Sequence, residues 1–257
     1  MRPRPGLGTV NHVTSEAIQR SYRFSQVFNF RDVGGYPGLA GRRVRWRRLY
    51  RSDTLSGLKE TDRTAFSRLG VRTVVDLRRG HEVNSQGQVP AWEGFTYHNI
   101  DPGHPEWVLT PYRDGQEPSR YLADRYHDMA ETGAAGLAAA IGLLADAQRA
   151  PAVVHCVAGK DRTGVVCALT LSLLGVTDDD IDADYALSSI GNRQYLAWAR
   201  DNNQAELTMQ PWFMSPPGTM RLFLSELRQR HGSVEDYLGR AGLASTQISA
   251  LRSHLLQ

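Results

Sequence analysis

The residues in this sequence best suited to chemistry are Cys156 and Arg162, which are separated by five residues. An apolar, β-branched run at 152–154 precedes them, and apolar residues at helical spacing follow Gly164, so the expected order is strand, tight loop, helix. Such a loop directs its backbone N–H groups, and the positive end of the helix dipole, at whatever lies in the turn. We therefore expect an oxyanion-binding active site at residues 155–164.

The two residue types have different tasks in such a site. Backbone dipoles and a guanidinium favour the thiolate of Cys156, which is the nucleophilic form of cysteine. Arg162 offers a planar fork to two oxygens of a phosphoryl group, and this contact tightens as the group flattens during transfer. Thr163 could donate its hydroxyl to the sulfur. A lone cysteine at a strand end is more often a core residue, but the complete string of residues favours catalysis.

The string His-Cys-Val-Ala-Gly-Lys-Asp-Arg-Thr-Gly resembles the signature of the Cys-x5-Arg protein tyrosine phosphatases. It is most similar to the atypical bacterial branch, which acts on phosphotyrosine and phosphoinositides. Three more motifs, at 29–35, 50–53 and 75–78, occur in the order found in that branch, so the resemblance covers roughly residues 28–250. It implies a protein-tyrosine phosphatase with a phosphocysteine intermediate, which could also act on phosphoserine, phosphothreonine and phosphoinositides.

We expect the loop itself to bind the phosphate. Lys160 adds a second positive charge beside Arg162, which suits substrates with more than one phosphate, and His155 is expected to brace the loop by hydrogen bonding. The predicted phosphate-binding residues are Val157, Ala158, Gly159, Lys160, Asp161, Arg162, Thr163 and Gly164.

Three aspartates could protonate the leaving oxygen. Asp76 is the first choice, because it lies near the C-terminal end of a predicted strand at 72–77, where open α/β sheets bind ligands. The branch that this chain resembles also places such an aspartate in this motif. A structural role for Asp76 with Arg78 is the competing interpretation. Asp161 inside the loop is the second choice, and Asp101 the third.

Composition indicates one ordinary globular domain, since 41% of the 257 residues are hydrophobic and 22% are charged. We predict an N-terminal arm at 1–27 and a phosphatase domain at 28–257. The two cysteines give no disulfide framework, and neither a signal segment nor a membrane span is evident. We therefore expect a cytoplasmic protein, with leaderless secretion and oligomeric state left open. We expect no metal, cofactor or nucleic acid, and at most peripheral membrane contact.

The predicted fold is α/β, with a central, mostly parallel sheet and helices on both faces. The patterns predict a strand at 42–50 with alternate arginines on one face, and helices at 61–70, 117–130, 133–148 and 182–201. Arg31 and Asp32 are expected to form a structural ion pair. A lid-like segment is predicted at about 191–218, where the irregular part at 204–218 could equally be a loop anchored by its aromatic residues.

Two other functions remain open at this point. A small-molecule phosphatase acting on inositol phosphates or nucleotides would use the same loop. A catalytically inactive phospho-binding module belongs to a different class, and it is disfavoured because Cys156, Arg162 and Thr163 are all present.

Overall fold

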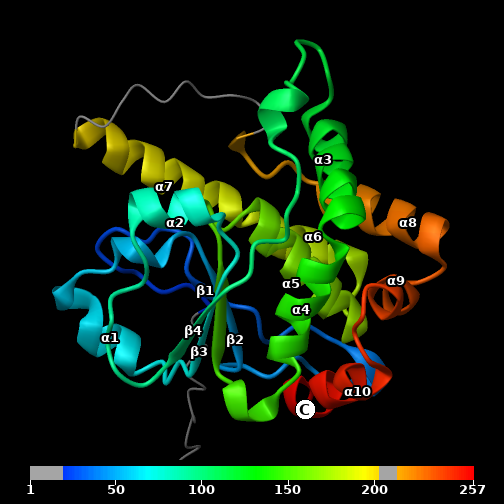
Figure 1. Ribbon diagram of the computed structural model, residues 1–257, viewed down its shortest axis with the longest axis horizontal. Coiled ribbons are helices and arrows are strands. Elements are labelled where there is room, and N and C mark those ends of the chain that lie inside the picture. Colours follow the sequence, from blue (N-terminus) through cyan, green and yellow to red (C-terminus); the bar gives the residue numbers. More distant parts are fainter. Residues whose placement is uncertain (1–19, 203–212) are drawn as a thin grey trace, which may run out of the picture.

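A five-stranded sheet forms the centre of the computed structural model, which describes residues 20–202 and 213–257. Its strands lie in the order β1-β2-β5-β3-β4. Figure 1 shows helices on both sides of this sheet. The pairing of β1 with β2 is antiparallel, and the other three pairings are parallel. The strand bounds are β1 Arg31–Asp32, β2 Leu49–Ser52, β3 Thr73–Asp76, β4 Thr96–Asn99 and β5 Ala152–His155. This confirms the predicted α/β class.

Both faces of the central strands are buried, which explains why their sequences are continuously apolar. Val75 and Val154 belong to the larger of two hydrophobic clusters. Val74 and Val153, their neighbours in the chain, belong to the smaller one on the other face. Because β5 pairs with both β2 and β3, the C-terminal ends of these parallel strands lie together at one edge.

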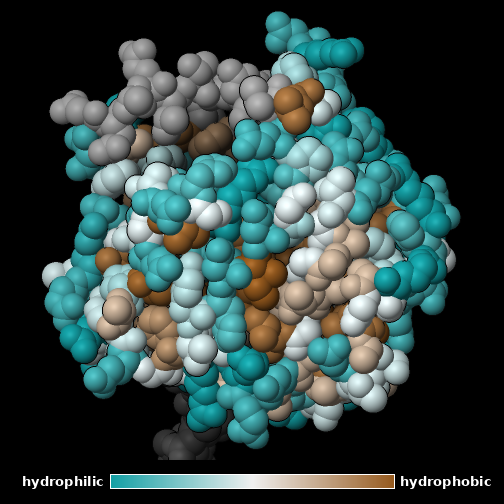
Figure 2. Space-filling view, viewed as in Figure 1, coloured by the Kyte–Doolittle hydropathy of each residue, from teal (hydrophilic) through white to brown (hydrophobic). Residues whose placement is uncertain are grey.

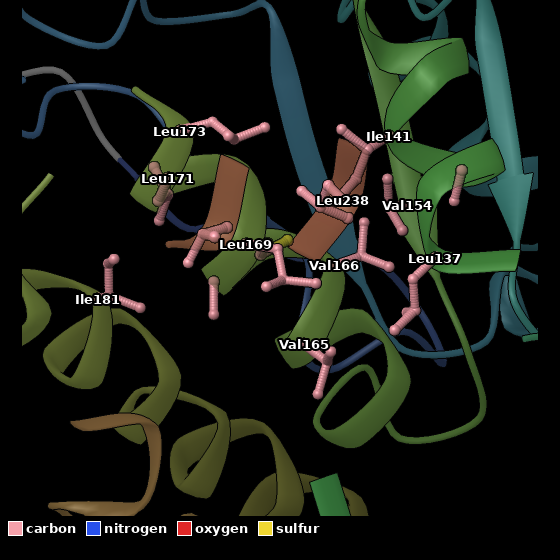
Figure 3. Close-up of a cluster of buried hydrophobic side chains, with 14 of the residues drawn as sticks. Leu137, Ile141, Val154, Val165, Val166, Leu169, Leu171, Leu173, Ile181 and Leu238 are labelled. Atoms are coloured by element: carbon pink, nitrogen blue, oxygen red, sulfur yellow. The ribbon is translucent and has the colours of Figure 1, made fainter. Parts of the chain in front are cut away.

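Helices cover the sheet, and α5 is the one that packs most centrally in the larger cluster. Side chains of α5, among them Val166 and Leu169, lie close to Val154 of β5, Ile141 of α4 and Leu238 of α9 (Figure 3). The helix bounds are α1 Arg63–Ser67, α2 Gly80–Gln86, α3 Pro118–Thr132, α4 Ala134–Leu144, α5 Asp161–Leu173, α6 Asp178–Ala186, α7 Ser188–Asp201, α8 Thr219–His231, α9 Val234–Arg240 and α10 Ser245–Leu255.

The surface in the view of Figure 2 is mostly hydrophilic, and pale to brown atoms gather over the alanine-rich helix α4. Within the described ranges, no helix combines the length and the apolar character needed to cross a membrane.

Two predicted elements differ from the structure. Residues 42–50 do not form one strand, since β2 begins at Leu49 and Arg47 has a left-handed φ of 60°. The Arg47 N–H donates to the Asp32 carboxylate, and this contact holds the bend. The predicted helix at 182–201 is divided into α6 and α7. Of the predicted lid, 191–201 is helical and 203–212 lies outside the described residues, so the lid stays a prediction.

Candidate active site

The phosphate loop lies between the end of β5 and the start of α5, as the sequence predicts. Gly159 has a φ of 65°, and a Cβ there would lie 2.3 Å from the carbonyl oxygen of Ser52, so only glycine fits. Among the residues that the structure describes, no side chain caps the N-terminus of α5. Its first N–H groups are therefore left to bind an anion.

Buried side chains hold the carbonyl oxygens of this loop from outside. Asn29 Nδ2 donates to the oxygen of Ala158 at 3.0 Å, and Arg51 Nη2 donates to that of Gly159 at 2.8 Å. The backbone N–H of Thr54 donates to the oxygen of Val157 at 2.9 Å. Three consecutive carbonyls thus have partners in the surrounding protein: the motifs at 29–35 and 50–53 supply two of them, and Thr54 directly follows the second motif.

Asp184 of α6 connects Arg51 with Arg31 in a buried ion-pair network. Its carboxylate lies 3.2 Å from Arg31 Nε and 2.6 Å from Arg51 Nη1. Burial alone would raise the pKa of Asp184, but the two arginines lower it to about 2. The expected pairing of Arg31 with Asp32 is therefore wrong. Asp32 instead accepts from the N–H groups of Gly34 and Arg47, because its carboxylate is turned toward that bend.

Cys156 is 2% exposed and lines a pocket of about 360 Å³. Within the described residues the pocket is lined by Arg79, His81, His104, Glu106, Trp107, Cys156, Val157, Ala158, Asp161 and Arg162. Four of the predicted site residues besides Cys156 are among them. The aromatic ring of Trp107 packs edge-on against Tyr121, with ring centroids 6.3 Å apart.

Glu82 of α2 holds Arg162, and the sequence analysis did not identify it. Its carboxylate accepts from both Nη1 and Nη2 of Arg162, the latter at 2.9 Å, and Nη1 also donates to the Leu77 carbonyl oxygen at 3.2 Å. Partial burial alone would raise the pKa of Glu82, but the hydrogen bonds from Arg162 hold it below its ordinary value. Glu82 also accepts from the Arg79 N–H at 2.7 Å, the contact that a glutamate at the third position of a helix makes with the N-cap backbone.

These contacts use three of the five N–H donors of the guanidinium of Arg162. Across residues 20–202 and 213–257, no acceptor is hydrogen-bonded to Nε or to the second hydrogen of Nη2. Those two donors lie on one edge of the guanidinium plane and match two oxygens of a phosphoryl group. Glu82 therefore leaves one complete edge of Arg162 for an anion.

Asp76 lies in a different environment from the one expected for a proton donor. Its side chain is fully buried and accepts from Arg78 Nε and Nη2, at 2.9 and 2.6 Å, and from the Tyr97 hydroxyl at 2.8 Å. Burial alone would raise its pKa, but the hydrogen bonds from Arg78 hold it below the ordinary value. Asp76 does not line the pocket of Cys156. These contacts favour the structural interpretation with Arg78 over the acid role.

Asp161 does line the pocket, at the first residue of α5. Its Oδ1 accepts from the Tyr126 hydroxyl at 2.7 Å and lies 3.2 Å from Lys160 Nζ. Tyr126 is buried in α3 and is also 2.7 Å from the Tyr185 hydroxyl. Asp101 is exposed after β4 and is not part of the pocket.

Other predicted residues of the loop are buried behind the pocket. Lys160 is 2% exposed, and its Nζ donates to the carbonyl oxygen of Met214 at 3.2 Å. Burial lowers the pKa of Lys160. Burial also lowers the pKa of His155 to about 4, so the ring is neutral near pH 7, with Nδ1 3.3 Å from the Cys156 carbonyl oxygen. The buried Thr163 Oγ1 has no hydrogen-bond partner among the described residues. Gly164 packs against Met220 and Tyr185.

An α/β fold with a buried cysteine in a loop between a strand and a helix N-terminus is the arrangement expected of a cysteine-dependent phosphatase. Residues 22–257 match the model of the family described as the tyrosine phosphatase family. The chain therefore belongs to the tyrosine phosphatase family.

Three relatives give the same assignment. One from Cupriavidus necator, whose name places it with the tyrosine-protein phosphatases, is 33% identical over 91% of this chain and 87% of its own length. The triple specificity protein phosphatase PtpB of Mycobacterium tuberculosis is 28% identical over 89% of this chain and 96% of its own length. A tyrosine-protein phosphatase of Nostoc commune is 27% identical over 80% of this chain and 74% of its own.

Proposed function

We propose that this phosphatase hydrolyses phosphotyrosine in two steps through a phosphocysteine intermediate. In the first step, the Cys156 thiolate attacks phosphorus, the bond to the tyrosyl oxygen breaks, and that oxygen takes a proton from Asp161. In the second step, Asp161 accepts a proton from water as the water attacks phosphorus. The sulfur–phosphorus bond then breaks and inorganic phosphate leaves. The observation that carries this proposal is that Cys156, Arg162 and Asp161 line one pocket.

The free edge of Arg162 and the N-terminal N–H groups of α5 would bind the equatorial phosphoryl oxygens. Both sets of donors are already oriented, so they stabilise the charge of the transition state without reorganisation. The Thr163 hydroxyl, which is buried without a partner among the described residues, would donate to the sulfur as it leaves.

Asp161 supports the proton-transfer role better than Asp76 does. Among the described residues, both contacts of its carboxylate are made by Oδ1, which leaves Oδ2 to carry the proton to the leaving oxygen. The carboxylate of Asp76 is enclosed by Arg78 and Tyr97 and does not line the pocket. A carboxylate that is buried and held by an arginine releases and accepts a proton less readily near neutral pH.

Phosphotyrosine is the substrate that the pocket supports best, because Trp107 lines it and supplies an aromatic ring for contact with a phenyl group. Phosphoserine, phosphothreonine and phosphoinositides are further proposed substrates, since the mycobacterial relative is named a triple specificity phosphatase. Because Lys160 is buried and does not line the pocket, its charge would act on a second phosphate only at a distance, without direct contact.

A matched substrate panel tests this proposal. Phosphate release is measured from phosphotyrosine, phosphoserine and phosphothreonine peptides, phosphoinositides, inositol phosphates and nucleotides, with Cys156→Ser as the blank. We expect phosphotyrosine peptides to lead by about tenfold or more in kcat/KM, and Cys156→Ser to lose turnover while still binding phosphate. A leading soluble metabolite would instead assign the enzyme to small-molecule metabolism, and turnover by Cys156→Ser would refute the covalent scheme.

A further inference from the structure

A second pocket adjoins the phosphate loop on the side away from Arg79 and Trp107. It has a volume of about 620 Å³, within the range of sites that bind small ligands. Val157 and Ala158 line both pockets, and they are the only lining residues shared within 20–202 and 213–257. The two pockets therefore meet at the loop that would hold the phosphate.

The walls of this second pocket come from α7, the end of α2 and the residues around β1 and β2 (Figure 1). Three of its aromatic rings form one cluster. Phe28 lies 5.9 Å from Tyr195 and 5.8 Å from Trp198, measured between ring centroids, and the Tyr195 and Trp198 rings are stacked at 6.1 Å. Tyr195 is 37% exposed, although a large aromatic side chain favours burial. This wall is suited to contact with another apolar or aromatic group.

The polar groups at the base of the pocket are already paired. The carboxylate of Asp53 accepts from the N–H groups of Phe28 and Asn29, at 3.0 Å for each of the shorter contacts. Asn192 Nδ2 donates to the carbonyl oxygen of Phe213 at 2.6 Å. Because these amides are already hydrogen-bonded and the carboxylate is negative, the floor of the pocket does not favour a phosphate. The same hydrogen bonds hold the aromatic wall in a fixed position.

Lys59 is exposed and supplies a positive charge to the lining. Among the described residues it takes part in no ion pair. An acidic group beside the apolar one would therefore gain from this lysine. A polyphosphorylated inositol headgroup fits less well, because it would bring several negative charges toward one lysine and the Asp53 carboxylate.

We propose that this second pocket binds an aromatic side chain of the same peptide whose phosphotyrosine occupies the catalytic pocket, with an acidic neighbour facing Lys59. The inference rests on the proposed phosphotyrosine activity and adds a sequence preference to it. The enzyme would select substrates by the residues that flank the phosphotyrosine, because one peptide would place its phosphotyrosine in the catalytic pocket and a flanking aromatic residue in the second pocket.

The test uses phosphotyrosine peptides that differ only in one residue, with Phe or Ala placed in turn at the three positions on either side of the phosphotyrosine. We expect Phe at one of these positions to raise kcat/KM about tenfold over Ala, as expected for burial of one aromatic side chain. Trp198→Ala should abolish this preference, and Trp198→Phe, which keeps an aromatic ring, should retain most of it. Trp92→Ala is the control, because Trp92 packs on Phe66 and lines neither pocket.

Turnover of free phosphotyrosine separates this inference from the proposed function. It should be the same in the wild type, Trp198→Ala and Trp92→Ala, because free phosphotyrosine reaches only the catalytic pocket. The inference is overturned if kcat/KM is no higher for Phe than for Ala at any position. It is also overturned if Trp198→Ala slows hydrolysis of free phosphotyrosine as much as hydrolysis of the peptide, or if this variant slows only the hydrolysis of phosphoinositides in vesicles. Absence of any phosphotyrosine hydrolysis would instead refute the proposed function. For Lys59→Ala, we expect loss of the preference for an acidic neighbour with the aromatic preference intact.

Discussion

Replacement of Glu82 by Gln tests how Arg162, the proposed phosphate-binding arginine, is held. Gln keeps one acceptor oxygen, but its amide NH2 then faces a guanidinium N–H, so the two-point contact with Arg162 is lost. The capping contact with the Arg79 N–H can persist, because Gln also serves in a capping box. The substitution therefore changes the orientation of Arg162 with little effect on α2.

The size of the effect follows from the geometry. A hydrogen bond to a charged group contributes about 1.5–3 kcal/mol. Water can replace only part of the lost contact, because the Glu82 and Arg162 side chains are 16% and 9% exposed. A loss of about 2 kcal/mol in transition-state stabilisation corresponds to a fall of roughly 30-fold in kcat. We expect no rise in KM, because removal of the Glu82 charge favours binding of a phosphate dianion nearby.

The assay is steady-state hydrolysis of a phosphotyrosine peptide, with thermal unfolding of each variant in parallel. Glu235→Gln is the matched control, since Glu235 also pairs with an arginine, Arg252, at 2.7 Å, but at the surface. Surface pairs contribute at most about 1 kcal/mol to stability, and this one lies outside both pockets. A folded Glu82→Gln enzyme with wild-type kcat, or an equal loss in Glu235→Gln, would refute the orienting role of Glu82.

Three further predictions follow from buried groups. Asp76→Asn should destabilise the fold by about 3–5 kcal/mol in urea unfolding, because it leaves Arg78 buried without its partner; lost activity at unchanged stability would restore Asp76 as the acid. Tyr126→Phe removes the hydroxyl that holds Oδ1 of Asp161, so kcat should fall at unchanged KM, and an unchanged kcat argues against Asp161 as the donor. Burial raises the pKa of Asp53 from 3.8 to about 6, so the contribution of this group to stability is full below about pH 3.8 and is lost as pH rises through 6. The free energy of unfolding of Asp53→Asn, relative to that of the wild type, should therefore rise by about 3 kcal/mol between pH 4 and 7, on top of any pH-independent difference. A difference in unfolding free energy that stays constant across that range would contradict the raised pKa.

The sequence alone located the strand, loop and helix of the proposed catalytic loop. Cys156 and Arg162 lie within ten residues that include a strand end, a turn requiring Gly159 and a helix start, and each of these follows from local rules. Local patterns locate this unit in the chain, although Asn29, Arg51 and Thr54 hold its carbonyl oxygens from outside. The α/β class followed in the same way, because apolar runs and helical spacing show which segments must be buried.

The tertiary structure decided which side chains serve this loop. Glu82 is 80 residues from Arg162 along the chain and Tyr126 is 35 residues from Asp161, so no local pattern connects them. Asp76 ends the predicted strand, but whether its carboxylate reaches the pocket or turns to Arg78 depends on the burial and partners around it. Residue type and spacing set what a group can do, whereas contacts between distant segments set its orientation, its solvation and thus its role.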